Sequence, residues 1–137
     1  MLEQVIYVSR AHEGVDAHQA YDIIRVSHNR NSRFGLTGGL LLLDGYFVQV
    51  LEGDRFHLHQ RLASIRADPR HGDFQLRWQG PIDDVCFAEE WMALRLDDGV
   101  SPALRESFGY VPGLPEDRFS GPQLLSFVLA CCLSPSD

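Results

Sequence analysis

The sequence predicts an α+β fold whose elements follow one another in the order β-α-β-β-α-β-β. Segments in which apolar and polar residues alternate, or which form short apolar runs, recur along the first 96 residues and are typical of strands. Between them lie two segments whose apolar residues recur at helical spacing. At the centre, Asp44-Gly45 separates two apolar runs and indicates a two-residue hairpin turn. A chain of 137 residues fits one domain of ordinary size.

The first two elements are a strand over residues 2–9 and a helix from about residue 17 to 33. Val5, Tyr7 and Ser9 share one face of the strand. Both faces are mostly apolar, which is typical of a central strand covered on both sides. The face of the helix that is expected to point inward carries Ala20, Ile23, Ile24, Ser27 and Asn31.

The hairpin consists of Leu40–Leu43 and Tyr46–Leu51. On its second strand, alternation places Gln49 on the same face as Phe47, so an amide points into an otherwise apolar surface.

The second helix and the last two strands follow the hairpin. Asp54 is suited to cap a helix that runs to about Ala67. Alternation over Phe74–Trp78 predicts a fourth strand that places Phe74, Leu76 and Trp78 on one face. Gly80-Pro81 predicts a turn, and alternation over Trp91–Leu96 predicts a fifth strand. This order is the ferredoxin-like pattern with one added strand, and it predicts a sheet with both helices on one face.

Residues 98–137 are expected to form a C-terminal helical cap or interaction segment beside the domain of residues 1–97. A short helix over 101–108 and a loop over 110–121 lead to an apolar helix over 122–133. A helix that is apolar nearly all round must be buried. We expect it to cover the open face of the sheet, to form a subunit contact, or both.

Composition excludes several classes of function. The net charge of −7 disfavours nucleic acid as the partner. The chain has no apolar run of 18 residues and no signal peptide, so we expect no membrane span and no secretion. Cys86, Cys131 and Cys132 are odd in number and two are adjacent, which favours a reduced, cytoplasmic protein over a disulfide framework. His57 and His59 point apart on a helix, and no other spacing indicates a metal site.

Tyr7, Asn31 and Gln49 are polar residues that the local pattern aims into an apolar region. Each could be a core residue with its own hydrogen-bond partner, as most buried polar groups are. Together they also fit a shared partner, because a flat heterocycle with carbonyl and N–H edges would satisfy both amides. Ile23 and Ile65 would then lie against the two faces of that ring.

Four stretches together resemble the BLUF domain, the flavin-binding sensor of blue light. They are Ile6–Arg10, Asn31–Gly38, Phe47–Gly53 and Ala67–His71, and the resemblance covers about residues 2–96 without a gap. Their combined spacing makes the resemblance specific, and the order of elements agrees with the family's fold.

The resemblance implies a non-covalent flavin, usually FAD with FMN possible, held between the two helices. Asn31 matches the asparagine that binds the pyrimidine edge, and Arg70 and His71 match positions near the carbonyl edge and the ribityl chain. Tyr7 matches the donor of an electron and a proton to the excited flavin, and Gln49 matches the amide between that tyrosine and the ring. Further pocket positions fall on Ile23, Ser27, Phe47 and Ile65.

The last strand departs from the family's pattern, in which Trp-x-Met is common. Met92 takes the place of the methionine and is the third photoactive residue that the resemblance implies. Glu90 takes the place of the tryptophan, and Trp91 follows one residue later, so it would face away from the flavin unless a bulge shifts the register.

The sequence thus predicts a short blue-light photoreceptor that is not an enzyme. Its output would pass to a protein partner, and a homo-oligomer is expected because the helix over 122–133 carries much apolar surface. A light-insensitive, flavin-binding interaction module is one alternative. The other is a small α+β enzyme, for which the sequence offers no convincing acid–base pair or nucleophile.

Overall fold

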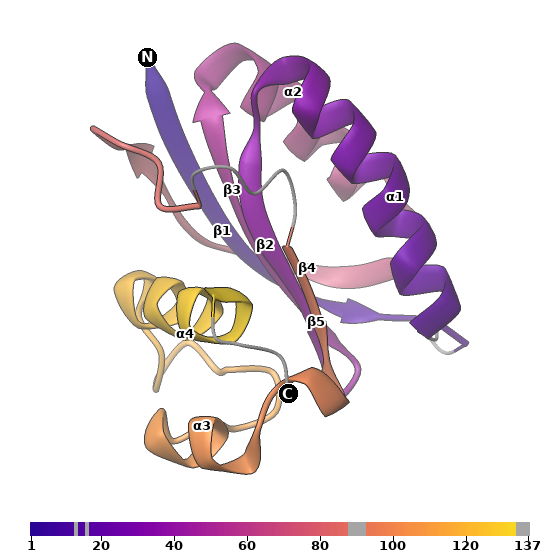
Figure 1. The fold of residues 1–137 in the computed structure, drawn as a ribbon, viewed down its shortest axis with the longest axis vertical. Coiled ribbons are helices and arrows are strands. Elements are labelled where there is room, and N and C mark those ends of the chain that lie inside the picture. The colour runs from indigo at the N-terminus through magenta and orange to yellow at the C-terminus, as the bar shows by residue number, and fades with distance from the viewer. Residues whose placement is uncertain (13, 16, 88–92, 134–137) are drawn as a thin grey trace.

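The computed structural model of the chain describes residues 1–12, 14–15, 17–87 and 93–133 (Figure 1). Its strands are β1 (Leu2–Ala11), β2 (Thr37–Leu43), β3 (Tyr46–Asp54), β4 (His71–Pro81) and β5 (Ala93–Leu96). Its helices are α1 (Ala17–Phe34), α2 (Arg55–Arg66), α3 (Pro102–Ser107) and α4 (Gly121–Leu133), with a 3-10 turn, η1, over Asp97–Gly99.

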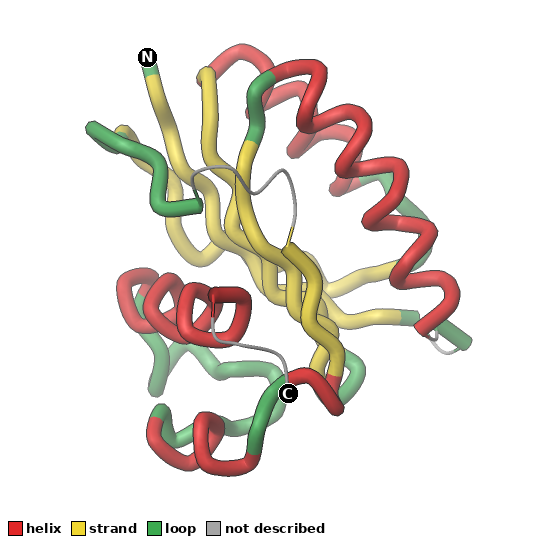
Figure 2. The backbone as a smooth tube through the Cα atoms, in the orientation of Figure 1, coloured by secondary structure: helices red, strands yellow, loops and turns green. Residues whose placement is uncertain are grey.

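The strands form one five-stranded mixed sheet in the order β4-β1-β3-β2-β5. β1 pairs antiparallel with β3 and β4, β2 pairs antiparallel with β3, and β5 lies parallel to β2. Helices α1 and α2 cover one face of the sheet, and α4 lies against the opposite face (Figures 1 and 2). The predicted α+β, ferredoxin-like arrangement with both helices on one face is confirmed.

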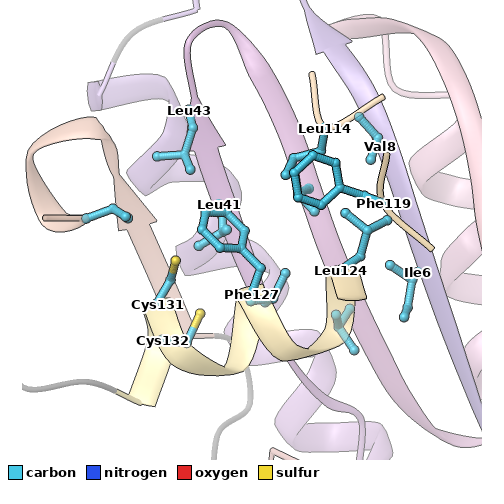
Figure 3. Close-up of a cluster of buried hydrophobic side chains, with 14 of the residues drawn as sticks. Ile6, Val8, Leu41, Leu43, Leu114, Phe119, Leu124, Phe127, Cys131 and Cys132 are labelled. Atoms are coloured by element: carbon cyan, nitrogen blue, oxygen red, sulfur yellow. The ribbon is translucent and has the colours of Figure 1, made fainter. Parts of the chain in front are cut away.

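Two apolar clusters, one on each side of the sheet, follow from the alternation of side chains along β1 and β3. Val5 and Tyr7 of β1 belong to the cluster beneath α1 and α2, whereas Ile6 and Val8 belong to the cluster beneath α4. Figure 3 shows this second cluster, in which Phe127 of α4 points toward the strands. The central position predicted for the first strand is confirmed.

Helix α2 begins where its capping residue was expected. The Asp54 carboxylate accepts hydrogen bonds from the backbone N–H groups of Phe56 at 3.1 Å and His57 at 3.4 Å. The turn predicted at Gly80-Pro81 is wrong. Strand β4 continues through Pro81, because Gly80 and Pro81 pair with the start of β1.

The prediction that Phe74, Leu76 and Trp78 share one face of β4 is also wrong. Phe74 packs in the cluster beneath α1 and α2, and Trp78 packs in the opposite cluster. The register of β4 against β1 shifts between Ile6, which pairs with Trp78, and Tyr7, which pairs with Leu76. An extra residue in one strand reverses the alternation beyond it, so Phe74 and Trp78 face opposite sides.

The C-terminal segment covers the open face of the sheet, as predicted. The Arg77 guanidinium of β4 donates hydrogen bonds to the backbone carbonyls of Leu114 at 2.7 Å and Phe119 at 2.8 Å. Arg95 of β5 donates to the carbonyl of Cys132 at 2.8 Å, near the end of α4. The division of the chain into residues 1–97 and 98–137, and the subunit contact of α4, stay predictions.

The contact between α4 and β2 depends on the absence of a side chain at Gly39. A Cβ atom there would lie 2.8 Å from Cys132 Sγ and 2.9 Å from a ring carbon of Phe87. We expect Gly39→Ala to lower the free energy of unfolding by about 1–3 kcal/mol, because overpacking displaces buried neighbours. Gly99→Ala, whose Cβ would meet Arg95 Cδ at 3.4 Å, is the matched control. Urea denaturation measures both, and equal stability of the two variants would contradict this account.

None of the helices that the structure describes is long and apolar enough to cross a bilayer. Within the same residues, no group of three or more His, Cys, Asp and Glu side chains could hold a metal ion.

Candidate functional site

A hollow lies on the side of the sheet that α1 and α2 cover, and the space between its walls, open solvent included, amounts to about 420 Å³. The described residues that line it are Tyr7, Ile23, Leu40, Phe47, Gln49, Arg61, Ile65, Asp68, Arg70 and His71. They come from β1, α1, β2, β3, α2, the turn after α2 and the start of β4. Half of these residues are apolar or aromatic, and the other half, Gln49, Arg61, Asp68, Arg70 and His71, are polar or charged.

Tyr7 and Gln49 form a hydrogen-bonded pair in this lining. They lie directly opposite each other on the antiparallel strands β1 and β3. The Tyr7 hydroxyl donates to Gln49 Oε1, and both side chains are buried, with 4% and 3% of their surface exposed. Burial raises the pKa of the Tyr7 phenol well above its ordinary value, so the phenol stays protonated at neutral pH. The pair is a neutral donor and acceptor placed in a cavity wall.

Aromatic neighbours fix the position of the Tyr7 ring. Phe74 stacks against it with ring centroids 4.8 Å apart, and His71 lies tilted at 6.2 Å. His71 Nε2 lies 2.6 Å from the carbonyl oxygen of Ile65, and Nδ1 lies 2.6 Å from Ser9 Oγ. A carbonyl oxygen only accepts, so Nε2 donates, and the neutral ring can accept the Ser9 hydroxyl proton at Nδ1. His71 thereby joins β4 to β1 and to the end of α2.

The family model described as "BLUF: Sensors of blue-light using FAD" matches residues 2–93 of the chain. The chain belongs to the BLUF family. The hollow, with its Tyr7–Gln49 pair, lies within the matched part.

Curated relatives share the BLUF part of much longer proteins. The photoactivated adenylate cyclase subunit beta of Euglena longa is 33% identical over 90 residues, which are 66% of this chain and 10% of that protein. The subunit alpha of Euglena gracilis is 35% identical over 81 residues, which are 59% of this chain and 8% of that protein. The chain thus spans about a tenth of the length of these relatives.

Solved structures match over almost the entire chain. The BLUF protein BlrB in its dark state has a TM-score of 0.73 and 28% identity, with 95% of this chain and 93% of that chain covered. BlsA in its photo-activated state has a TM-score of 0.83 with 100% and 99% covered, and at 19% identity this likeness concerns the fold alone. Klebsiella pneumoniae BlrP1, solved with FMN and cyclic diGMP, has a TM-score of 0.72 and 27% identity, with 95% and 35% covered. The described elements correspond to the BLUF module of these proteins.

The residues that the sequence assigned to the flavin site fall into three groups. The structure brings seven of them into the lining: Tyr7, Ile23, Phe47, Gln49, Ile65, Arg70 and His71. Asn31 is completely buried near the end of α1 and is not among the described lining residues. The side chain of Ser27, and Met92 with its neighbours Glu90 and Trp91, lie outside the described residues.

Leu40, Arg61 and Asp68 line the hollow, although the sequence did not single them out. The Asp68 carboxylate accepts hydrogen bonds from Arg70 Nε at 2.9 and 3.1 Å and from the Arg70 backbone N–H at 2.9 Å. These hydrogen bonds lower the pKa of Asp68 and raise that of Arg70. This ion pair holds the turn after α2. Asp68 could have been identified from the sequence, because it lies two residues before Arg70, which the resemblance assigned to the site.

Proposed function

We propose that this chain is a blue-light photoreceptor that binds FAD non-covalently in the hollow and responds to light through Tyr7 and Gln49. FMN is the other flavin that this site would accept. The observation that carries the proposal is the buried hydrogen bond from the Tyr7 hydroxyl to Gln49 Oε1 in the wall of the hollow beneath α1 and α2. Both residues match the positions to which the resemblance to the BLUF domain assigned the donor and the amide.

The lining suits a flavin. Phe47, Ile23 and Ile65 supply apolar surface for the faces of a flat ring, and the amide and guanidinium groups of Gln49 and Arg70 suit its polar edge. A buried carboxamide at Asn31 suits the pyrimidine edge, and Ser27, one turn before Asn31 in the sequence of α1, is the remaining pocket candidate.

A bound flavin would supply an excited-state oxidant under blue light. The Tyr7 phenol would give one electron to that oxidant, and its proton would move to Gln49 Oε1 along their hydrogen bond. The raised pKa keeps that proton on the phenol before illumination. Gln49 carries a donor end and an acceptor end, so reversal or tautomerisation of its amide redirects hydrogen bonds without changing the charge.

A route for the signal starts at β3. Gln49 pairs with Leu40 of β2, and Leu40 pairs in turn with Leu94 of β5. A rearranged amide can therefore act on the strand that follows Met92, with α4 on the other side of the sheet. We propose that this strand and residues 98–137 pass the signal to a protein partner, in a homo-oligomer. A preference of about 1–3 kcal/mol for one of two states is sufficient.

The competing function is a flavin-binding module that does not respond to light. Glu90, in the place of the family's tryptophan, is the observation that favours it. The absorption spectrum after illumination distinguishes the two functions.

The test is the absorption spectrum of the purified, flavin-loaded protein before and after blue light. A photoreceptor shows a red shift of the flavin bands that reverses in the dark. An unchanged spectrum identifies the light-insensitive module, and a protein that takes up no flavin refutes both.

A further inference from the structure

The turn between β2 and β3 is joined to the C-terminal segment by four side chains, which we call the turn contact: Asp44, Asp97, Arg105 and Tyr110. Asp44 lies in the turn and Asp97 directly follows β5, whereas Arg105 belongs to α3. The Asp44 carboxylate accepts a hydrogen bond from the Tyr110 hydroxyl at 2.6 Å and lies 3.4 Å from Arg105 Nη1. Burial and the Asp44 carboxylate raise the pKa of the Tyr110 phenol well above its usual value, so the phenol remains a donor.

The turn contact also joins the ends of two parallel strands. β5 runs beside β2 with Leu96 opposite Leu42, so both strands end at the same edge of the sheet (Figure 1). The backbone N–H of Asp44 donates to Asp97 Oδ1 at 3.0 Å. Arg105 Nη2 donates to the Asp97 carbonyl oxygen at 2.8 Å and lies 3.4 Å from Asp97 Oδ1. Arg105 therefore holds α3 to the end of β2 and to the end of β5 at once.

The two sides of this contact differ in how firmly the sheet holds them. Asp44 and Gly45 have φ values of 52° and 80°, the left-handed conformation that a tight hairpin turn requires, so the hairpin fixes the Asp44 side. β5 has four residues and lies at the edge of the sheet, with β2 as its neighbour. A displacement of β5 along β2 would therefore move Asp97 away from Asp44, and Arg105 could not keep its bonds to both.

From this arrangement we infer that the turn contact is where a light-driven displacement of β5 relative to β2 releases α3 from the sheet. The inference rests on the proposed function, in which Gln49 acts on β5 through Leu40, and it adds the part of the C-terminal segment that receives the change. The charged side chains are partly open to solvent, 40% for Asp44 and 58% for Asp97. Ion pairs at such positions contribute little to stability, so a small displacement is sufficient to open the contact.

The test is the hydrogen exchange of backbone amides, measured by mass spectrometry on the flavin-loaded protein in the dark and under blue light. In the unaltered protein we expect light to speed the exchange of residues 97–110 by about fivefold or more. Arg105→Gln removes the cation that binds both aspartates, so this segment should exchange rapidly already in the dark, and light should change its rate by less than about twofold. The red shift of the flavin should remain, because Tyr7 and Gln49 are unaltered.

Arg118→Gln is the matched control. It removes the same charge from an exposed residue of the same segment, and Arg118 is not part of the turn contact. We expect its exchange to equal that of the unaltered protein both in the dark and in the light.

The flavin-free protein supplies a measurement that does not depend on light. Asp44→Asn removes the charge that faces Arg105 and keeps a residue suited to the turn, since Asn-Gly favours the same conformation. Each single variant should speed the exchange of residues 97–110. The double variant should exchange no faster than Arg105→Gln alone, because the two residues act through one contact.

Two outcomes would overturn the inference and leave the proposed function intact. One is a red shift of the flavin without any change in the exchange of residues 97–110, and the other is an Arg105→Gln protein whose exchange responds to light like that of the unaltered protein. Additive effects of Asp44→Asn and Arg105→Gln would also overturn it, because the two side chains would then act separately. A protein without any red shift refutes the proposed function and the inference together, and the absorption spectrum of the same samples distinguishes this case.

Discussion

Replacing Tyr7 by phenylalanine is expected to leave the flavin bound and to abolish the red-shifted state that blue light produces. The phenylalanine ring keeps the stacking on Phe74 at 4.8 Å, so the shape of the hollow is preserved. It lacks the hydroxyl that donates to Gln49 Oε1, and with it the proton that leaves along that bond. The Gln49 carbonyl oxygen also loses its donor, which lowers the free energy of unfolding by about 1–3 kcal/mol. Difference absorption spectra during illumination measure the loss.

Gln49→Leu tests the other half of the pair. Leucine is similar in size to glutamine but has neither a donor nor an acceptor, so we expect flavin binding without the spectral shift. Tyr46→Phe is the matched control, because Tyr46 lies on the same strand but packs against the opposite cluster. Its photocycle should equal that of the unaltered protein. A normal red shift in Tyr7→Phe or in Gln49→Leu would disprove the roles assigned to these residues.

Most of the fold could be predicted from the sequence because its signals are local. Alternation in β1, the Asp44-Gly45 turn and the Asp54 cap each depend on neighbours in the chain. The faces of β4 could not be predicted in this way. They depend on a register shift against β1, which is set by pairing between residues about 70 positions apart, such as Tyr7 with Leu76.

The candidate site could also be predicted in part, because some of its residues stand out from their neighbours in the chain. Tyr7 and Gln49 stood out because a polar side chain interrupts an apolar face, and the resemblance to a family gave Arg70 and His71. Arg61 carried no such signal, because an arginine on a helix is ordinarily a solvated residue. Arg61 lies at the hollow only because of the way α2 is oriented against the sheet.

Glu52 is the clearest example of a residue whose importance only the structure reveals. In the sequence it directly follows the apolar run Tyr46–Leu51, yet its carboxylate is completely buried. Glu52 Oε1 accepts a hydrogen bond from the Phe87 backbone N–H at 2.8 Å, and Oε2 accepts from the Cys86 N–H at 2.8 Å. Gln4 Nε2 donates to Oε2 at 3.0 Å, and the Thr37 hydroxyl donates to Oε1 at 3.3 Å. One carboxylate thus joins β1, β2 and β3 to the chain that follows β4.

Glu52→Leu is expected to lower the free energy of unfolding by about 3 kcal/mol, which is a large share of the stability of a small domain. The N–H groups of Cys86 and of the buried Phe87 would lose their acceptor, and no apolar side chain can replace it. Thr37→Val removes only one donor from the same carboxylate and should lower stability by about 1 kcal/mol. Urea denaturation of both variants, with and without flavin, measures the difference.

Glu52→Leu also tests whether the chain after β4 can lose its anchor while flavin binding in the hollow is retained. Glu52 does not line the hollow, so Glu52→Leu should still bind flavin at temperatures where it remains folded. Cys86 and Phe87 directly precede the segment with Glu90, Trp91 and Met92, so we expect the loss of their anchor to alter the lifetime of the lit state. A Glu52→Leu protein as stable as Thr37→Val would mean that the Cys86 and Phe87 N–H groups find other acceptors, and the carboxylate would then not be the anchor.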